Sequence, residues 1–196
     1  MKLNTPNKLT IARMIISPLY LAVILWESLP HRFLWALIIF SVASITDAMD
    51  GKLARKNNQI TNFGKLLDPI ADKVLTTAAL LAFMKLGLCN IWIVMIVLTR
   101  EFAIASIRMI AAANGTVIPA NIWGKLKTVS QMTFTIIIML LCEVYYILEK
   151  SYMNIFAKMP SLSVISNSLL WVTAILTIIS GVIYIKDSKN AIDYSK

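Results

Sequence analysis

The sequence has little acidic charge, one histidine and few cysteines. It contains 10 Asp and Glu residues, one His and two Cys among 196 residues. One histidine cannot build a histidine metal site, and the isolated Cys89 and Cys142 form neither a disulfide framework nor a metal site. We expect both cysteines to be buried apolar residues and His31 to lie in a loop. The sequence also lacks P-loop, GxSxG and CxxC motifs, so nothing supports nucleotide hydrolysis of the usual kind or serine or thiol chemistry.

Apolar residues dominate what is present. The chain is 58% hydrophobic and only 15% charged, with a mean hydropathy of +0.74. Apolar runs of about 20 residues have the length that crosses a bilayer as an α-helix. Six such runs are predicted, at residues 10–28, 32–50, 66–87, 90–113, 122–148 and 162–186. The sequence therefore predicts one all-α integral membrane domain over residues 1–196, with six transmembrane helices.

Positive charge gathers between alternate runs. Of the 19 Lys and Arg residues, 15 lie in residues 1–13, 51–73, 100–127 and 186–196. An even number of spans places these stretches on one side, and the positive-inside rule makes that side cytoplasmic. We therefore expect a multi-pass protein of the cell membrane with both termini in the cytoplasm. The net charge of +9 favours contact with membrane lipids and anionic substrates, and no nucleic-acid module is recognisable.

Four of the six aspartates fall within residues 47–72. Asp47 and Asp50 are three residues apart and Asp68 and Asp72 are four apart, so each pair projects from one face of its predicted helix. The two helices are consecutive and antiparallel, so the four carboxylates can converge at the cytoplasmic side. Such a cluster requires cations, and oxygen ligands in this number suit two Mg²⁺ or Mn²⁺ ions about 3.5 to 4 Å apart.

A simpler alternative is a solvated loop in which these acids pair with neighbouring Lys and Arg side chains. That alternative does not explain the helical spacing on both sides of the loop, or the small residues Gly51, Ala54 and Gly64 among the acids. Small residues let a substrate approach the backbone closely, and Arg55 is a fixed cation suited to a phosphate. We therefore favour a binding site for a phosphate-bearing ligand.

The acidic segment also has the spacing of a known signature. The CDP-alcohol phosphotransferase family, which has a six-helix fold, has a signature that resembles Asp47-x2-Asp50-Gly51-x2-Ala54-Arg55, then eight residues, then Gly64-x3-Asp68-x3-Asp72. Bacterial phosphatidylglycerophosphate synthases within it are similar at Asn4-x-Pro6-Asn7-x-Leu9-Thr10-x-x-Arg13, Arg100-Glu101-Phe102-Ala103-Ile104 with Arg108, and Gly124-Lys125-Leu126-Lys127-Thr128.

This resemblance implies a transferase of phospholipid biosynthesis. The phosphatidyl group of CDP-diacylglycerol would pass to sn-glycerol 3-phosphate, with release of CMP, at an active site on the cytoplasmic side. The implied ligands of two Mg²⁺ or Mn²⁺ ions are Asp47, Asp50, Asp68 and Asp72, and Asp72 is also the implied general base. The implied CDP-binding residues are Gly51, Ala54, Arg55 and Gly64. Members of the family are commonly homodimers, so we expect a homodimer.

The acceptor's phosphate needs cations of its own. Arg100 and Arg108 are eight residues apart, a little over two helical turns, so they lie near one helix face. We expect Arg100, Arg108 and Lys125 to bind this phosphate, with Lys127 left out and Glu101 as the candidate that orients Arg100. The alternative is that these cations reach lipid headgroups. Arg108, however, lies inside an apolar run, where a guanidinium requires an anionic partner.

Two other functions remain open. Within the family, the acceptor could be inositol phosphate, serine or phosphatidylglycerol, although the basic set favours a small phosphorylated alcohol over serine. A cation or proton transporter would also use aspartates in a membrane. Transporters favour inverted repeats and acids at the membrane midplane, whereas this chain has no internal repeat and its acids gather at the predicted cytoplasmic end.

Overall fold

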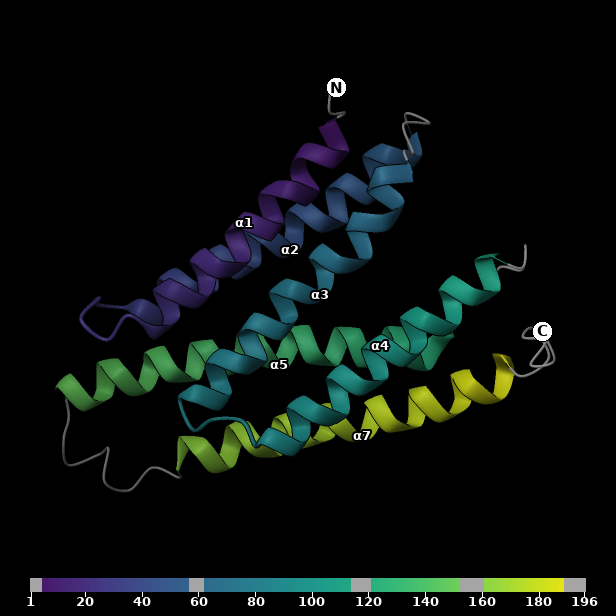
Figure 1. The fold of residues 1–196 in the computed structure, drawn as a ribbon. Coiled ribbons are helices and arrows are strands. Elements are labelled where there is room, and N and C mark those ends of the chain that lie inside the picture. The colour runs from purple at the N-terminus through teal and green to yellow at the C-terminus, as the bar shows by residue number, and fades with distance from the viewer. Residues whose placement is uncertain (1–4, 57–61, 114–120, 152–160, 189–196) are drawn as a thin grey trace.

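The structure is a computed structural model that describes residues 5–56, 62–113, 121–151 and 161–188. Side chains are described within residues 10–46, 70–112, 121–150 and 161–188, with the exception of Asp72. The described ranges form six α-helices (Figure 1), which are α1 Thr5–Leu25, α2 Arg32–Lys56, α3 Asn62–Lys85, α4 Ile91–Ala113, α5 Ile122–Ser151 and α7 Leu162–Ser188. Each overlaps one predicted apolar run, which confirms the all-α class.

Helices α2 and α3 extend beyond their apolar runs into the charged sequence between them. The prediction ended the second run at residue 50 and began the third at residue 66, whereas α2 ends at Lys56 and α3 begins at Asn62. The added residues of α2 include Leu, Ala, Lys and Arg, which are good helix formers. The four motif aspartates therefore all lie on helical backbone, as the argument from their spacing requires.

Two helices are long and apolar enough to cross a membrane by themselves. They are α5, over Ile122–Lys150 with 29 residues, and α7, over Leu162–Ser188 with 27 residues. A helix of that length extends about 40 Å, which exceeds the roughly 30 Å hydrocarbon core of a bilayer. Shorter apolar helical stretches are Thr10–Leu25 and Arg32–Thr46. Large apolar side chains face outward, such as Trp92, which is 66% exposed. The protein is therefore a membrane protein.

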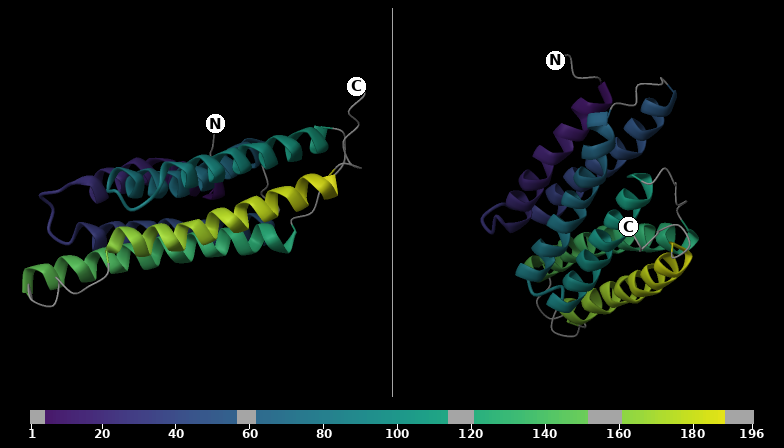
Figure 2. Two further views of the ribbon diagram at one scale, coloured as in Figure 1. Left: turned by 90° about the horizontal axis from the view of Figure 1, so that it is seen from below. Right: turned by 45° about the vertical axis from the view of Figure 1, so that its right-hand side comes forward.

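The helices pack in two groups of three. Helix α1 packs against both α2 and α3, while α7 packs against both α4 and α5. Contacts of α2 with α5 and of α3 with α4 join the groups (Figures 1 and 2). Tyr20 of α1 is fully buried where the groups meet, with its ring 5.8 Å from that of Phe40 and its hydroxyl 3.5 Å from the sulfur of Met139 on α5.

The helices alternate in direction, so each end of the molecule collects a defined set of helix termini. The first turns of α1, α3 and α5 and the last turns of α2, α4 and α7 lie toward one side (Figure 1), which we call the motif end. The opposite side, the distal end, holds the turn at Gly87, whose φ of 73° suits glycine. The acidic motif and the predicted acceptor-binding cations are therefore carried on the same half of the molecule.

A side-chain pair joins two helices at the distal end. His31 precedes α2, and its Nδ1 hydrogen-bonds the carboxylate of Glu143 on α5, which also accepts a 3.3 Å hydrogen bond from the Leu34 amide. The His31 ring meets the Tyr146 ring edge-on, with their centroids 5.4 Å apart. His31 lies in a loop, as predicted, but its partner is 112 residues away and was not foreseen. Both cysteines are buried, as expected.

Candidate active site

The acidic motif is divided between two helices at the motif end. Asp47 and Asp50 lie in the last half of α2, and Asp68 and Asp72 lie in the first half of α3. The predicted CDP-binding residues have helical backbone too, with Gly51, Ala54 and Arg55 on α2 and Gly64 on α3. The side chains of these eight residues lie outside the described part of the chain, so their roles stay predictions. Among the side chains that are described, no three His, Cys, Asp or Glu residues gather in a way that could hold a metal.

A cluster of charged side chains surrounds Glu101 of α4. Lys127 of α5 donates a 2.6 Å hydrogen bond to Glu101 Oε1, and Arg100 Nη1 donates a 3.0 Å hydrogen bond to the same oxygen. Lys73 of α3 has its Nζ 3.8 Å from Glu101 Oε2 and donates a 2.9 Å hydrogen bond to the Glu101 carbonyl. We call Lys73, Arg100, Glu101 and Lys127 the Glu101 cluster. It joins three helices through one carboxylate.

Arg100 is held on its other side by α7. Its Nη2 donates a 2.6 Å hydrogen bond to the hydroxyl of Ser180. Two glycines make room for it: a Cβ on Gly124 would lie 3.3 Å from Nη2, and a Cβ on Gly181 would lie 3.3 Å from the Arg100 Cγ. Both distances are shorter than ordinary van der Waals contact. The guanidinium, with 13% of its side chain exposed, is therefore fixed by packing as well as by hydrogen bonds.

The Glu101 cluster contains more positive than negative charge. Three cations share one carboxylate, and the Lys127 side chain is only 4% exposed. Buried charges are costly unless they are paired, so Glu101 allows the cations to gather here. Lys73 and Glu101 keep 24% and 20% of their side chains exposed, so the cluster remains accessible. Three basic side chains on an accessible cluster suit an anionic ligand such as a phosphate.

Lys73 connects this cluster to the acidic motif. It directly follows Asp72 on α3, and its amino group touches both the backbone and the side chain of Glu101. Adjacent Cα atoms are about 3.8 Å apart. The backbone of Asp72 therefore lies one residue from a side chain of the Glu101 cluster. Acids suited to metal ions and cations suited to phosphate are carried side by side on one helix.

Arg108 lies two turns further along α4, toward the motif end. Its Nε donates a 3.1 Å hydrogen bond to the hydroxyl of Tyr184 on α7, and its Cζ is 5.3 Å from the centre of that ring. Arg100 and Arg108 thus both contact α7, which confirms that they share a helix face. Within the described residues the side-chain partner of Arg108 is a phenol and Arg108 is exposed, so its assignment to the acceptor's phosphate stays a prediction. Lys125 is also exposed, in the first turn of α5.

The structure adds residues that sequence reasoning missed. Lys127 was left out of the predicted site, yet it makes the shortest contact to Glu101. No residue of α7 was predicted to belong to the site, but Ser180 and Tyr184 contact Arg100 and Arg108. The signal was present as small and polar residues in an apolar helix, and the buried ones are Ser166, Thr173, Ala174, Thr177, Ser180, Gly181, Tyr184 and Ser188. Their three- and four-residue spacing marks a face that packs against other helices.

Comparison with known proteins places the chain in a family. Residues 3–179 match the CDP-alcohol phosphatidyltransferase family, and the chain belongs to it. A Bacillus subtilis protein named CDP-diacylglycerol–glycerol-3-phosphate 3-phosphatidyltransferase is 42% identical over 140 residues, which are 66% of this chain and 72% of that protein. Proteins of the same name from Rickettsia bellii and Haemophilus influenzae are 37% and 36% identical over 95% and 98% of this chain, and over 96% and 97% of their own lengths. The resemblance seen in the acidic motif is confirmed.

Proposed function

We propose that this protein transfers the phosphatidyl group from CDP-diacylglycerol to sn-glycerol 3-phosphate and releases CMP. The observation that carries the proposal is the junction on α3, where Asp72 is followed by Lys73 of the Glu101 cluster. The reaction joins a pyrophosphate donor to an acceptor that carries its own phosphate. It therefore needs metal-binding acids and basic side chains next to each other. The names of the relatives support the same reaction.

The donor would bind at α2 and the first half of α3. Asp47, Asp50, Asp68 and Asp72 would hold two Mg²⁺ or Mn²⁺ ions, for which carboxylate oxygens are suitable ligands. Such ions, when bound, neutralise pyrophosphate charge and stabilise a leaving phosphate. The CDP moiety would lie over Gly51, Ala54, Arg55 and Gly64. Glycine and alanine leave space there, and Arg55 offers a fixed cation to a phosphate.

Asp72 would act as the general base. It takes the proton of the glycerol hydroxyl, whose oxygen forms a bond to the phosphorus that carries diacylglycerol. The bond between that phosphorus and the bridging oxygen of the pyrophosphate breaks, and CMP leaves with the electron pair of this bond. An in-line displacement of this kind depends on positioning and charge stabilisation more than on covalent help from the protein.

The acceptor's phosphate would bind at the Glu101 cluster and its neighbours. Arg100 would offer its guanidinium edge, with Arg108 and Lys125 completing the site toward the motif end. Glu101 and Ser180 hold Arg100 in place, and Tyr184 holds Arg108. Lys127 and Lys73 add charge at the cluster. This arrangement favours a phosphorylated alcohol over serine, which has no phosphate for these basic side chains to bind.

We also infer how the protein lies in the membrane. All six helices would cross the bilayer, with the motif end at the cytoplasmic face and both termini in the cytoplasm. The concentration of 15 of the 19 Lys and Arg residues in stretches that adjoin the motif end supports this orientation. Water-soluble glycerol 3-phosphate and CMP would exchange with the cytoplasm, and CDP-diacylglycerol would enter from the inner leaflet. The working unit would be a homodimer.

Purified protein in detergent micelles tests the activity directly. CDP-diacylglycerol and glycerol 3-phosphate should yield CMP and phosphatidylglycerophosphate. EDTA should stop the reaction, and added Mg²⁺ or Mn²⁺ should restore it. Inositol phosphate, serine and phosphatidylglycerol serve as alternative acceptors in the same assay. Faster CMP release with any of them than with glycerol 3-phosphate would replace the proposed acceptor. Metal-dependent cation flux in liposomes that lack CDP-diacylglycerol would instead support a transporter.

A further inference from the structure

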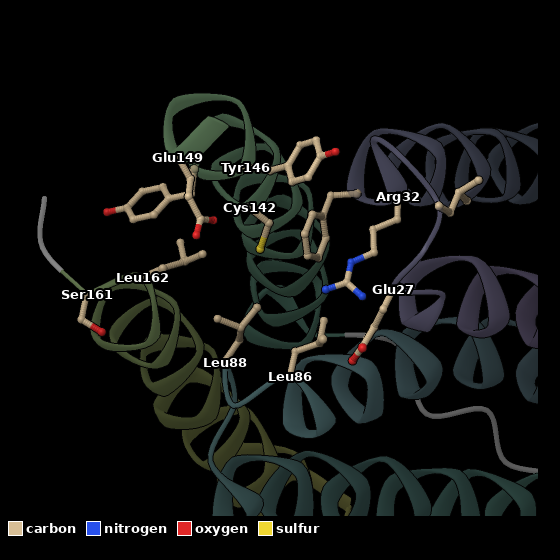
Figure 3. Close-up of a pocket in the computed structure, with 12 residues that line it drawn as sticks. Glu27, Arg32, Leu86, Leu88, Cys142, Tyr146, Glu149, Ser161 and Leu162 are labelled. Carbon is tan, nitrogen blue, oxygen red and sulfur yellow. The ribbon is translucent and has the colours of Figure 1, made fainter. Parts of the chain in front are cut away.

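The distal end contains a cavity that the proposed reaction does not use. Its volume is about 500 Å³, within the usual range for sites that bind small ligands. Its walls come from the loop before α2, the end of α3, the last turns of α5 and the start of α7 (Figure 3). The acidic motif lies at the other end of these helices. A ligand bound in this cavity would therefore be separate from both proposed substrates.

Arg32 is the cation of this cavity. It is the first residue of α2, and its guanidinium points into the cavity in Figure 3. Its Cζ lies 4.8 Å from the centre of the Phe33 ring, which fixes the guanidinium without using its N–H groups. Nη1 is buried, yet it has no hydrogen-bond partner among the described residues. A buried donor left without an acceptor is unfavourable, so an anionic oxygen ligand is expected at this atom.

Carboxylates line the same cavity. Glu27 and Glu149 belong to its walls, and the carboxylate of Glu149 points inward in Figure 3. Glu143 is close in sequence to Glu149 but is already bound by His31 and the Leu34 amide. The cavity thus offers one guanidinium and two carboxylates. A ligand that matches the cavity carries both an anionic group and a cationic group with N–H donors.

The rest of the wall is apolar. Four apolar side chains contribute to it, those of Phe33, Leu86, Leu88 and Leu162. The three leucines are labelled in Figure 3. The cavity also lies at the ends of membrane helices, where lipid headgroups meet the protein. A free small ion would gain nothing from the leucine side chains. A lipid would place its glycerol and upper acyl carbons against them.

We propose that this cavity binds the headgroup of a zwitterionic phospholipid of the phosphoethanolamine type. The phosphodiester accepts hydrogen bonds from Arg32, and the ammonium donates to Glu149 and Glu27. A choline headgroup has no N–H to donate, and a phosphoglycerol headgroup has no cation to offset two carboxylates. The proposal does not depend on the transferase activity, because it uses none of the residues assigned to the reaction.

Native mass spectrometry of the delipidated full-length protein tests this inference. Phosphatidylethanolamine, phosphatidylglycerol and phosphatidylcholine with identical acyl chains are added separately. Phosphatidylethanolamine should bind most tightly, and Arg32→Gln should weaken it about tenfold, the effect of one lost charge-assisted hydrogen bond. Glu149→Gln should reduce the preference for phosphatidylethanolamine over phosphatidylglycerol. Lys150→Gln is the matched control, because it changes a charge at the next position without altering the cavity wall.

Competition distinguishes a lipid from a free phosphate. Soluble glycerophosphoethanolamine should displace the lipid at high concentration, whereas inorganic phosphate should not. Equal lipid binding by Arg32→Gln and the natural protein would overturn the proposal, as would a preference for phosphatidylglycerol or equal competition by inorganic phosphate. Arg32→Gln should lower the melting temperature by no more than a few degrees, because it loses only the contact with the Phe33 ring and Arg32 Nη1 makes no hydrogen bond to lose. Its CMP release from CDP-diacylglycerol in detergent without added phosphatidylethanolamine should also be unchanged, so this test stays independent of the proposed reaction.

Discussion

Replacement of Glu101 by Gln removes one negative charge from the centre of its cluster. The carboxylate accepts hydrogen bonds from Lys127 at 2.6 Å and Arg100 at 3.0 Å, and Lys73 lies 3.8 Å away. A Gln oxygen can still accept one strong hydrogen bond but cannot balance three cations. Lys127, with a side chain only 4% exposed, would lose the negative charge of Glu101. A buried lysine is destabilising when a carboxylate that pairs with it is removed.

The expected loss of stability follows from burial. Removing one partner of a fully buried ion pair costs about 3 to 5 kcal/mol. Because the Glu101 side chain is 20% exposed, solvent screening reduces the expected cost to about 2 to 3 kcal/mol. For a chain of this size, that cost lowers the melting temperature by about 5 to 10 °C. Thermal unfolding in detergent micelles measures it. Asp187→Asn, at an exposed acid in the last turns of α7, is the matched control and should leave the melting temperature nearly unchanged.

The same substitution should also affect the acceptor more than the donor. Arg100 would keep its contact with Ser180 but lose the one with Glu101, so its guanidinium would no longer be fixed in one position. We expect the KM for glycerol 3-phosphate to rise about tenfold, the equivalent of one charge-assisted hydrogen bond, with little change in the KM for CDP-diacylglycerol. Glu101→Asp should restore part of the acceptor affinity. Unchanged stability together with an unchanged acceptor KM would refute the organising role of Glu101.

Three further predictions concern the acids and the arginines. Asp72→Asn should abolish CMP release but leave CDP-diacylglycerol binding largely intact, and normal turnover would show that Asp72 is not the base. Asp47→Asn should weaken Mn²⁺ binding and CDP-diacylglycerol binding together, which calorimetry with each ligand measures; unaltered Mn²⁺ affinity would remove Asp47 from the ligand set. Arg108→Ala should raise the KM for glycerol 3-phosphate far more than Tyr184→Phe, because the latter loses only the 3.1 Å hydrogen bond and keeps the ring. Equal KM values for the two variants and the natural protein would return Arg108 to a structural role.

The sequence predicted the helices well because bilayer thickness sets their length. All six apolar runs correspond to helices, and the largest boundary errors fall at the start of α1, the end of α2 and the start of α3, where the helix continues past the apolar residues. The acidic motif could be predicted because its residues are close in sequence and spaced by the turn of a helix. These spacings involve residues close to one another in the chain, so a single sequence is enough to detect them.

The partners of the site could not be predicted in the same way. Lys127 lies in the first turns of α5, a position from which a lysine commonly reaches lipid headgroups. Its contact with Glu101 depends on how α5 packs against α4. Ser180 contacts Arg100 across 80 residues of sequence, and His31 finds Glu143 across 112. Such pairs depend on which helix faces meet. Helical periodicity identifies a face but does not identify its neighbour.

The adjacency of Asp72 and Lys73 has a consequence for how an acceptor is chosen. Lys73 contacts Glu101, which also binds Arg100, so the packing of α3 against α4 sets the spacing between the two points at which an acceptor would be held. That spacing does not change when a loop moves. Alcohols would therefore be sorted by the number of atoms between the hydroxyl that reacts and the phosphate that anchors it. A molecule longer than glycerol 3-phosphate would anchor correctly yet carry its hydroxyl past the carboxylate, and would remain bound without reacting.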